Sequence, residues 1–261
     1  MPLSEPLNSF WFAYETLAKA SRETAWGLVV TDARYPRIYD ANHAGVVDAH
    51  PGLTLRDIRD ELLPELDAVG CPYEHIEFLD GDEATADCPA FRELRAAMPD
   101  STPDALMVFE PGDVPEPAAD ARIAEEPLED ELWRAYRDSR TEFGEDLDEG
   151  VLDQLVERDR DVLVPAGLRI FAARVEGKIA GFASLMSMAG VGYVDNVVTL
   201  TAFRRRGIAS AVVSRVVRAS RQAGDELCFL FAENGMAPQR IYERLGFRTR
   251  QLAYGFTRPR S

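Results

Sequence analysis

The sequence contains few residues of the types that hold metals or form covalent cross-links. It has three cysteines, far apart along the chain: Cys71, Cys88 and Cys228. An odd number without metal-ligand spacing favours reduced thiols over a disulfide framework or a zinc site. The three histidines lie in the first third of the chain and show no ligand spacing either: His43, His50 and His75. No metal is therefore expected.

Long apolar runs and surplus positive charge are also missing. No window of about eighteen apolar residues offers a membrane span, and the first twenty residues lack the basic start and apolar run of a signal peptide. The net charge is −16, and Lys19 and Lys178 are the only lysines. This balance argues against nucleic acid or an anionic membrane as the main partner. We expect a cytoplasmic protein.

The length and apolar content of the chain suit one large domain or two small ones. It has 261 residues, of which 46% are hydrophobic. A proline-rich, acidic stretch at 111–120 is typical of a linker and predicts a boundary near residue 118. Residues 1–118 then form a smaller α/β domain. Its expected helices cover 8–20, 54–69 and 84–98, and its expected strands cover 26–30, 73–78 and 104–109, with a short extended piece within 39–47.

Residues 119–261 follow a different order of elements. Apolar periodicity predicts a strand, two helices, three antiparallel strands, a helix, a strand, a helix and a closing strand. The strands are expected at 121–124, 168–175, 178–186, 194–200, 227–232 and 247–257. The helices are expected at 127–143, 147–160, 208–223 and 237–245.

The most informative stretch is Val194–Gly224, which is predicted to form a strand, a basic turn and an amphipathic helix. The first N–H groups of a helix have no internal partner, and the helix dipole gives that end partial positive charge. Gly207 lets the backbone approach an anion closely. Arg204, Arg205 and Arg206 add forked donors suited to phosphate oxygens. An ordinary strand–turn–helix with solvated arginines remains the alternative for this segment alone.

Two motifs in order make the pattern more specific. Arg204-x-x-Gly207-x-Ala209 resembles the acyl-CoA pyrophosphate loop of the GNAT N-acyltransferases. Asn234, followed by Tyr242-Glu243-Arg244-Leu245-Gly246-Phe247, resembles that family's second signature. The resemblance covers residues 119–258 and implies an α/β (α+β) GNAT fold with a mixed, centrally splayed sheet. Residues 1–118 would then be either a degenerate GNAT half, as in tandem members, or an unrelated α/β domain.

The resemblance also implies a cosubstrate, acetyl-CoA, and the residues that hold it. The pantetheine arm would bind the backbone edge of the central strand, and the pyrophosphate would lie on the amides of the turn. Asn234 would hydrogen-bond the pantetheine or hold the splayed strand, although an Asn beside Gly235 is equally explained as a turn residue. The implied binding residues are Val197, Val198, Thr199, Arg204, Arg205, Arg206, Gly207, Ile208, Ala209, Ser210 and Asn234.

The implied reaction is attack by an amine on the thioester carbonyl, which needs proton transfer at both ends. By resemblance, Tyr242 protonates the leaving thiolate, since a phenol with a pKa of about 10 carries its proton at neutral pH. A Tyr that only packs on the core is the alternative. Asp195, on the central strand, is the candidate base, with Glu233 as the second choice. A strand-end Asp satisfied by neighbouring N–H groups explains Asp195 equally well.

The expected helices at 127–143 and 147–160 are rich in acid and would wall the acceptor pocket in this family. A negative wall would attract a cationic amine, whereas a solvated acidic surface explains most of these residues without a ligand. The sequence leaves open a homodimer and a second function class, a non-catalytic acyl-CoA sensor or scaffold. The acidic residues are Glu125, Glu126, Glu129, Asp130, Glu131, Glu142, Glu145, Asp146, Asp148 and Glu149.

Overall fold

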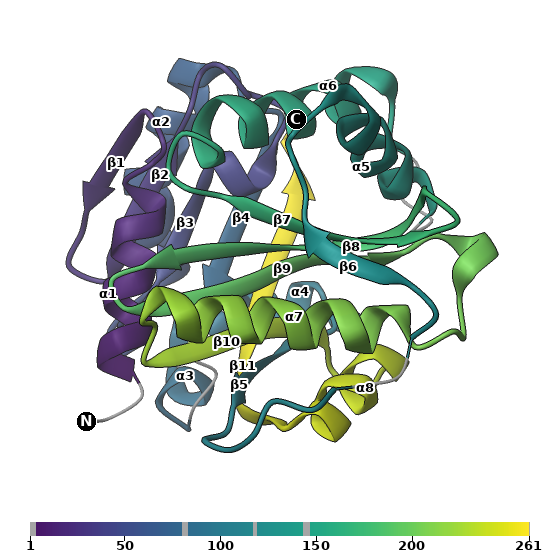
Figure 1. Ribbon diagram of the computed structural model, residues 1–261. Coiled ribbons are helices and arrows are strands. Elements are labelled where there is room, and N and C mark those ends of the chain that lie inside the picture. The colour runs from purple at the N-terminus through teal and green to yellow at the C-terminus, as the bar shows by residue number, and fades with distance from the viewer. Residues whose placement is uncertain (1–3, 80–82, 117–118, 143–146, 261) are drawn as a thin grey trace. The chain divides into compact units, whose positions relative to one another are not determined.

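The chain divides into two compact units, each made of separate segments of sequence. A computed structural model describes residues 4–79, 83–116, 119–142 and 147–260 (Figure 1). Unit 1 comprises Met1–Phe10, Met107–Phe231 and Ala237–Arg248. Unit 2 comprises Trp11–Leu106, Ala232–Met236 and Thr249–Ser261. The boundary predicted at residue 118 falls outside the described residues and stays a prediction.

The predicted order of elements after the linker is found. The strands and helices in this part of the chain are β6 (Arg122–Glu125), α5 (Asp130–Glu142), α6 (Glu149–Arg158), the π-helical turn η2 (Asp159–Leu163), β7 (Arg169–Val175), β8 (Lys178–Met188), β9 (Val191–Thr199), η3 (Thr201–Phe203), α7 (Ile208–Ala223), β10 (Leu227–Glu233), α8 (Ala237–Leu245) and β11 (Phe247–Pro259). Four elements contribute residues to both units: α1 (Ser4–Glu15), β5 (Asp104–Phe109), β10 and β11.

The sheet of unit 1 is mixed and opens at its centre. β6, β7, β8 and β9 pair as antiparallel neighbours, and β10 lies parallel to β9. The register of β10 with β9 covers Leu227–Phe229 opposite Val191–Tyr193. β9 continues to Thr199 along β8, where Thr199 faces Gly181. The two parallel strands therefore part after Tyr193 and Phe229, as the predicted splayed sheet requires.

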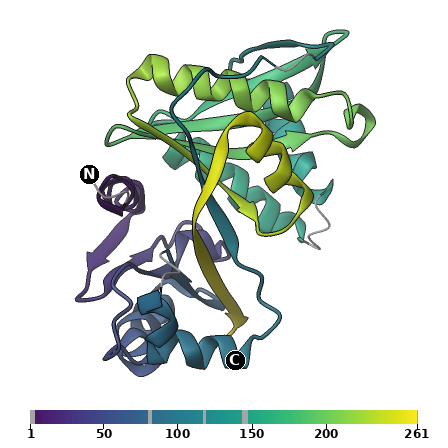
Figure 2. The same cartoon turned by 90° about the horizontal axis from the view of Figure 1, so that it is seen from below.

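Helices cover both faces of this sheet. α7 lies along one face of β7–β9, and α5 with α6 lies on the other (Figures 1 and 2). The apolar residues on the α5 side form one core cluster, because alternate residues of a strand face the same side. This cluster is Leu132, Trp133, Tyr136, Val156, Ile170, Ala172, Ile179, Phe182 and Val198. On the opposite side Arg215 of α7 lies over the Phe171 ring.

The strands of unit 2 pair in the order β1 (Ala20–Glu23), β2 (Gly27–Thr31), β3 (His43–Val46), β4 (Tyr73–Phe78) and β11. Only the β3–β4 pair among these is parallel. Helices α2 (Leu55–Val69) and α4 (Pro89–Ala97) pack on one face, where Ile58, Leu62 and Phe78 are fully buried. A capping box at Thr54 begins α2, and left-handed Gly70 ends it.

Some predicted boundaries were wrong. The helix expected over 84–98 is two helices, α3 (Glu83–Asp87) and α4, because Pro89 lacks an N–H and holds Cys88 in the extended region. The first helix was placed too late, since α1 begins at Ser4 and Ala20 starts strand β1. The extended piece at 39–47 begins as the 3₁₀ turn η1 (Tyr39–Ala41) and continues as β3.

Candidate acyl-CoA and proton-transfer site

The N-terminus of α7 forms an exposed backbone turn. Gly207 is the N-cap, with φ 74°, and no side chain caps the helix there. Arg205 also has positive φ, 61°. Left-handed residues in a turn direct consecutive N–H groups toward a common point, which makes a concave anion site. Ile208 is buried and anchors the helix, while residues 204–207 are exposed. The predicted amide cradle is thus accessible to solvent.

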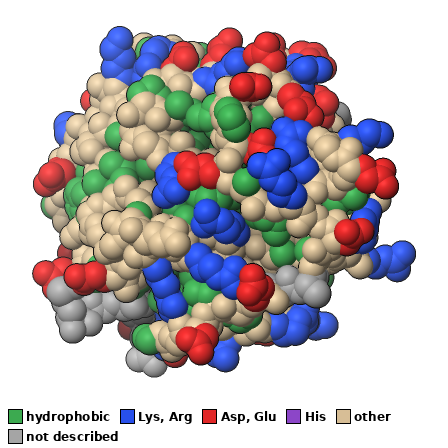
Figure 3. Space-filling view, in the orientation of Figure 1, with side chains coloured by type: hydrophobic (Ala, Val, Ile, Leu, Met, Phe, Trp, Pro, Cys, Tyr) green, Lys and Arg blue, Asp and Glu red, His purple; other side chains and the backbone are tan. Residues whose placement is uncertain are grey.

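The three arginines of this turn are exposed. Arg204 Nε donates to the carbonyl oxygen of Thr199 at 3.3 Å. Arg206 Nη2 donates to Asp120 Oδ2 at 3.2 Å, and its guanidinium lies 5.8 Å from the centre of the Phe203 ring. Basic side chains also gather, between acidic ones, on the side of the molecule that carries α7 (Figure 3). Positive charge is therefore concentrated around this helix in a strongly acidic chain.

The end of β9 offers one backbone edge away from β8. Val198 pairs with Phe182 and Thr199 with Gly181, which uses the β8 side of the strand. The pairing with β10 ends at Tyr193. Thr199 Oγ1 is buried and has no hydrogen-bond partner within the described part of the chain. The predicted pantetheine edge, Val197–Thr199, thus lies beyond the point where the parallel strands separate.

Aromatic rings cluster where the parallel strands begin to part. Tyr193 and Phe229 stack with centroids 4.8 Å apart and planes 11° from parallel. Phe10 of α1 meets Phe229 edge-on at 5.2 Å, and Phe231 meets Tyr193 edge-on at 6.1 Å. Paired residues of neighbouring strands face the same side of a sheet, so these rings pack together on one face where the strands begin to part.

Tyr242 and Asp195 lie in the same unit and interact electrostatically. Tyr242, on α8, is buried, and its ring packs edge-on against Phe247 at 6.1 Å. Burial raises the pKa of the Tyr242 phenol well above its ordinary value, and the negative charge of Asp195 raises it further. An ordinary phenol is already protonated at neutral pH, and the raised pKa leaves Tyr242 in that state, which a general acid needs.

Asp195 sits beside a bulge in β9. Phe182 faces Val198 and Ser184 faces Asp195, so two residues of β9 oppose one of β8. Asn196, in the bulge, has φ 51°, and its Nδ2 donates to Asp195 Oδ2 at 3.0 Å. Arg140 of α5 donates to Asn196 Oδ1 at 2.6 Å. Sequence reasoning missed Asn196 and Arg140, because neither belongs to a local motif.

Asn234 and Glu233 belong to unit 2. The Asn234 N–H donates to the Pro103 carbonyl at 3.1 Å, and both Asn234 and Glu233 are exposed. The predicted contact of Asn234 with pantetheine and the choice of Glu233 as a base remain predictions.

The acidic wall is largely matched by arginine. Arg169 binds Glu125, Arg174 binds Glu126 and Glu131, Arg160 lies 3.5 Å from Asp130, and Arg137 binds Glu149. Asp148 caps α6 through the Val151 N–H. Glu145 and Asp146 lie outside the described residues, as does the side chain of Glu142. These ion pairs favour the interpretation that the acidic residues form a structured protein surface. The acidic residues are therefore weak evidence for a cationic acceptor.

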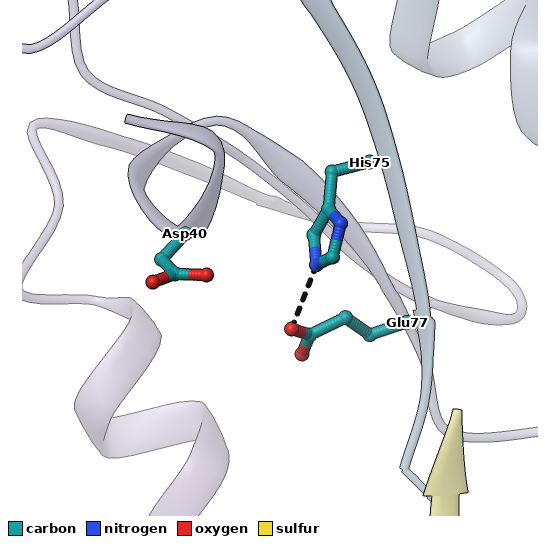
Figure 4. A group of neighbouring side chains, drawn as sticks. All are labelled: Asp40, His75 and Glu77. Carbon is teal, nitrogen blue, oxygen red and sulfur yellow. Dashed lines mark hydrogen bonds and ion pairs between the residues drawn. The ribbon is translucent and has the colours of Figure 1, made fainter. Parts of the chain in front are cut away.

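Unit 2 contains a cluster that the histidine spacing did not predict. Asp40, His75 and Glu77 bring ligand-type atoms within 4.8 Å of one another (Figure 4). His75 Nε2 lies 2.8 Å from Glu77 Oε1, and its Nδ1 lies 2.6 Å from Thr257 Oγ1. Burial opposes the charged ring, but the hydrogen bond and charge of Glu77 outweigh it and raise the pKa of His75. A proton shared by an ion pair accounts for this geometry.

Comparison with known proteins identifies the architecture. Residues 126–247 match the family model of the Acetyltransferase (GNAT) family. A GCN5-related N-acetyltransferase from Kribbella flavida has a TM-score of 0.66 at 20% identity, covering 100% of this chain and 97% of its own. A conserved protein of unknown function from Staphylococcus epidermidis has a TM-score of 0.67 at 12% identity, covering 92% and 93%. No curated protein matches the sequence.

A tandem GNAT protein from the clavulanic acid biosynthesis pathway is also similar. Its TM-score is 0.55 at 15% identity, covering 82% of this chain and 77% of its own. At these identities the likeness concerns the fold alone. Among the described residues, no helix is both long and apolar enough to cross a membrane.

Proposed function

We propose that this chain, which belongs over residues 126–247 to the acetyltransferase (GNAT) family, transfers an acetyl group from acetyl-CoA to a primary amine by direct attack in a ternary complex. The observation that carries the proposal is the state of Tyr242. Its phenol carries its proton at neutral pH and lies buried in the unit that also holds Asp195 and the open end of β9. The exposed turn at residues 204–207 and the left-handed N-cap Gly207, with no side chain capping the helix, support a diphosphate site in that unit.

Each proposed role follows from the chemistry of the group. The amine nitrogen attacks the thioester carbonyl after losing a proton, which Asp195 accepts directly or through water. The carbon–sulfur bond of the tetrahedral intermediate then breaks, and the Tyr242 hydroxyl gives its proton to the departing thiolate. The amides of Gly207–Ser210 and the turn arginines would hold the diphosphate, and the edge of Val197–Thr199 would hold the pantetheine amides.

The test is thiol release from acetyl-CoA with a panel of primary amines, compared between wild type and Tyr242→Phe. We expect the variant to bind CoA with unchanged Kd and to lose most of kcat, by about a hundredfold, the usual contribution of one proton-transfer group. Tyr254→Phe, which alters a half-buried tyrosine of unit 2, is the matched control. Turnover with alcohols alone would refute the amine acceptor.

The same experiment addresses the alternative function, a non-catalytic acyl-CoA sensor or scaffold. Such a protein would bind CoA in calorimetry without releasing thiol from acetyl-CoA for any amine. Equal thiol release by wild type and Tyr242→Phe would instead remove Tyr242 from the mechanism.

A further inference from the structure

A partly buried chain of polar groups links α5 to β9. Arg140 Nη2 donates to the Tyr136 hydroxyl at 2.9 Å and to Asn196 Oδ1 at 2.6 Å. The Tyr136 hydroxyl in turn donates to Asp159 Oδ2 on η2. Asn196 Nδ2 donates to Asp195 Oδ2 at 3.0 Å. Two other elements, α5 and η2, are thus linked to the strand that carries the candidate base.

The conformation of Asn196 is what the bulge demands. Its φ of 51° lies in the left-handed region, which costs most L-residues about 1 kcal/mol or more, while Asn tolerates it better than most. The bulge places Asn196 and Val197 opposite the single residue Ala183. An extra residue in a strand redirects the neighbouring side chains. The side chain of Asp195 is therefore set by a local shape that Asn196 has to maintain.

Arg140 fixes which way the Asn196 amide points. A guanidinium can only donate, so the amide oxygen faces Arg140 and the amide nitrogen faces Asp195. The opposite orientation would bring N–H groups against the guanidinium and an oxygen against the carboxylate. The amide thereby presents a donor to Asp195 in a defined direction.

We propose that Arg140 is a positioning residue for the transfer reaction, acting through Asn196 to hold the β9 bulge and to orient the Asp195 carboxylate. The inference rests on the proposed function and deepens it. Arg140 has no need to touch substrate in this role, because its effect reaches the reacting groups through one amide. The charged and titratable groups coupled to Asp195 are Arg140 and Tyr136 from α5 and Tyr242 from α8.

Asn196→Gly is the first variant to measure, since Gly adopts positive φ without strain and removes only the amide. We expect CoA to bind with unchanged Kd and kcat/KM to fall about tenfold to a hundredfold, within the range that base catalysis supplies. The acid limb of the kcat/KM profile should move to higher pH, because the carboxylate loses a donor that favours its charged form.

Two further variants separate positioning from folding. Asn42→Gly removes a fully buried amide in unit 2, whose Nδ2 donates to the Tyr35 and Ile38 carbonyls. It should lower Tm and leave the pH profile of the folded enzyme unmoved. Arg140→Lys keeps the positive charge but loses the planar fork. It should lower kcat/KM by about threefold to tenfold and shift the acid limb in the same direction.

The outcomes are distinct. No thiol release by wild type with any amine would refute the proposed function and this inference together. Normal wild-type turnover, with kcat/KM and the pH profile of Asn196→Gly unchanged, would overturn the inference alone. If Asn196→Gly fails to fold, Arg140→Lys decides, and a profile identical to wild type overturns the inference.

Discussion

The rings of Tyr193 and Phe229 stack on each other at the last paired position of β9 and β10, directly before the two strands part. The same pair of residues therefore ends the parallel ladder and packs on one face of the sheet beside the opening. Phe10 adds a third ring from α1.

Removing one of these rings should weaken both stability and cosubstrate binding. Phe229 is fully buried, so Phe229→Ala should cost about 3–5 kcal/mol of unfolding free energy through lost burial and a residual cavity. Chemical denaturation measures this loss, and CoA affinity should fall in the fraction that stays folded. Phe229→Leu, which keeps most of the volume, is the control. A loss below about 1 kcal/mol for the Ala variant would contradict the packing argument.

Gly207→Ala tests the anion site at the start of α7. A Cβ at φ 74° adds strain of about 1 kcal/mol. We expect CoA to bind about tenfold more weakly, the effect of losing one charge-assisted hydrogen bond, as measured by calorimetry. Gly224→Ala is the matched control, because Gly224 has φ 90° at the other end of the same helix. Equal loss of CoA affinity in both variants would reduce the effect to helix strain.

The His75–Glu77 pair predicts a pH window for stability. The pKa of His75 is raised above its ordinary value of 6.5. The stabilisation that protonated His75 adds to the folded state is therefore complete below pH 6.5, and it is lost as the pH rises through the raised pKa. For Glu77, burial works against charge, but the hydrogen bond and charge of His75 lower its pKa from 4.5 to about 2. Its contribution is present above pH 4.5 and is lost as pH falls toward 2.

Glu77→Gln should therefore lower the free energy of unfolding most between about pH 4.5 and 6.5, where both members of the ion pair are charged. The loss should be about 1–2 kcal/mol, since 31% of the Glu77 side chain is exposed to screening solvent. Urea denaturation at pH 3, 5.5 and 9 would show it. Asp60→Asn, which breaks the exposed pair with Arg56, should have little effect at any of these pH values. A flat pH profile for Glu77→Gln would exclude the ion pair.

The cysteine thiols should be unreactive in the folded protein. Cys71, Cys88 and Cys228 are all buried and free. Burial raises the pKa of Cys228 to about 12, so almost none of it is thiolate at neutral pH. We expect an aromatic disulfide reagent to titrate no thiols in the native protein and three after denaturation. Rapid native labelling would contradict this and would also invalidate thiol release as a measure of CoA formation.

Local signals made much of this fold predictable. α7 was predicted at its observed bounds, because apolar periodicity and glycines at both ends agree. β4 and β5 were likewise predicted at their bounds. Strand β1 was missed because its four residues, Ala20–Glu23, are all exposed and carry no alternation. The helix break at Pro89 was overlooked although proline chemistry predicts it.

The site was predictable only where it follows a motif. The turn at 204–207 and Tyr242 belong to local signatures, whereas Arg140 meets Asn196 across 56 positions of sequence. Long-range side-chain pairs leave no trace in periodicity, and positive φ at Asn196 is a property of the folded strand. The sequence also did not reveal that each unit is made of separate segments of the chain. That arrangement depends on long-range pairing, such as the pairing of residues 254–259 with 73–78.

Because of that pairing, the β4 edge of unit 2 can be covered only after the last strand of the chain has been synthesised. Strand β4 has β3 on one side and waits for residues 254–259 on the other, by which time residues 107–248 have left the ribosome. A nascent or prematurely ended chain would present the bare edge of β4 to other molecules, and such edges seed aggregation. Chaperone engagement during translation should therefore persist until β11 has been made.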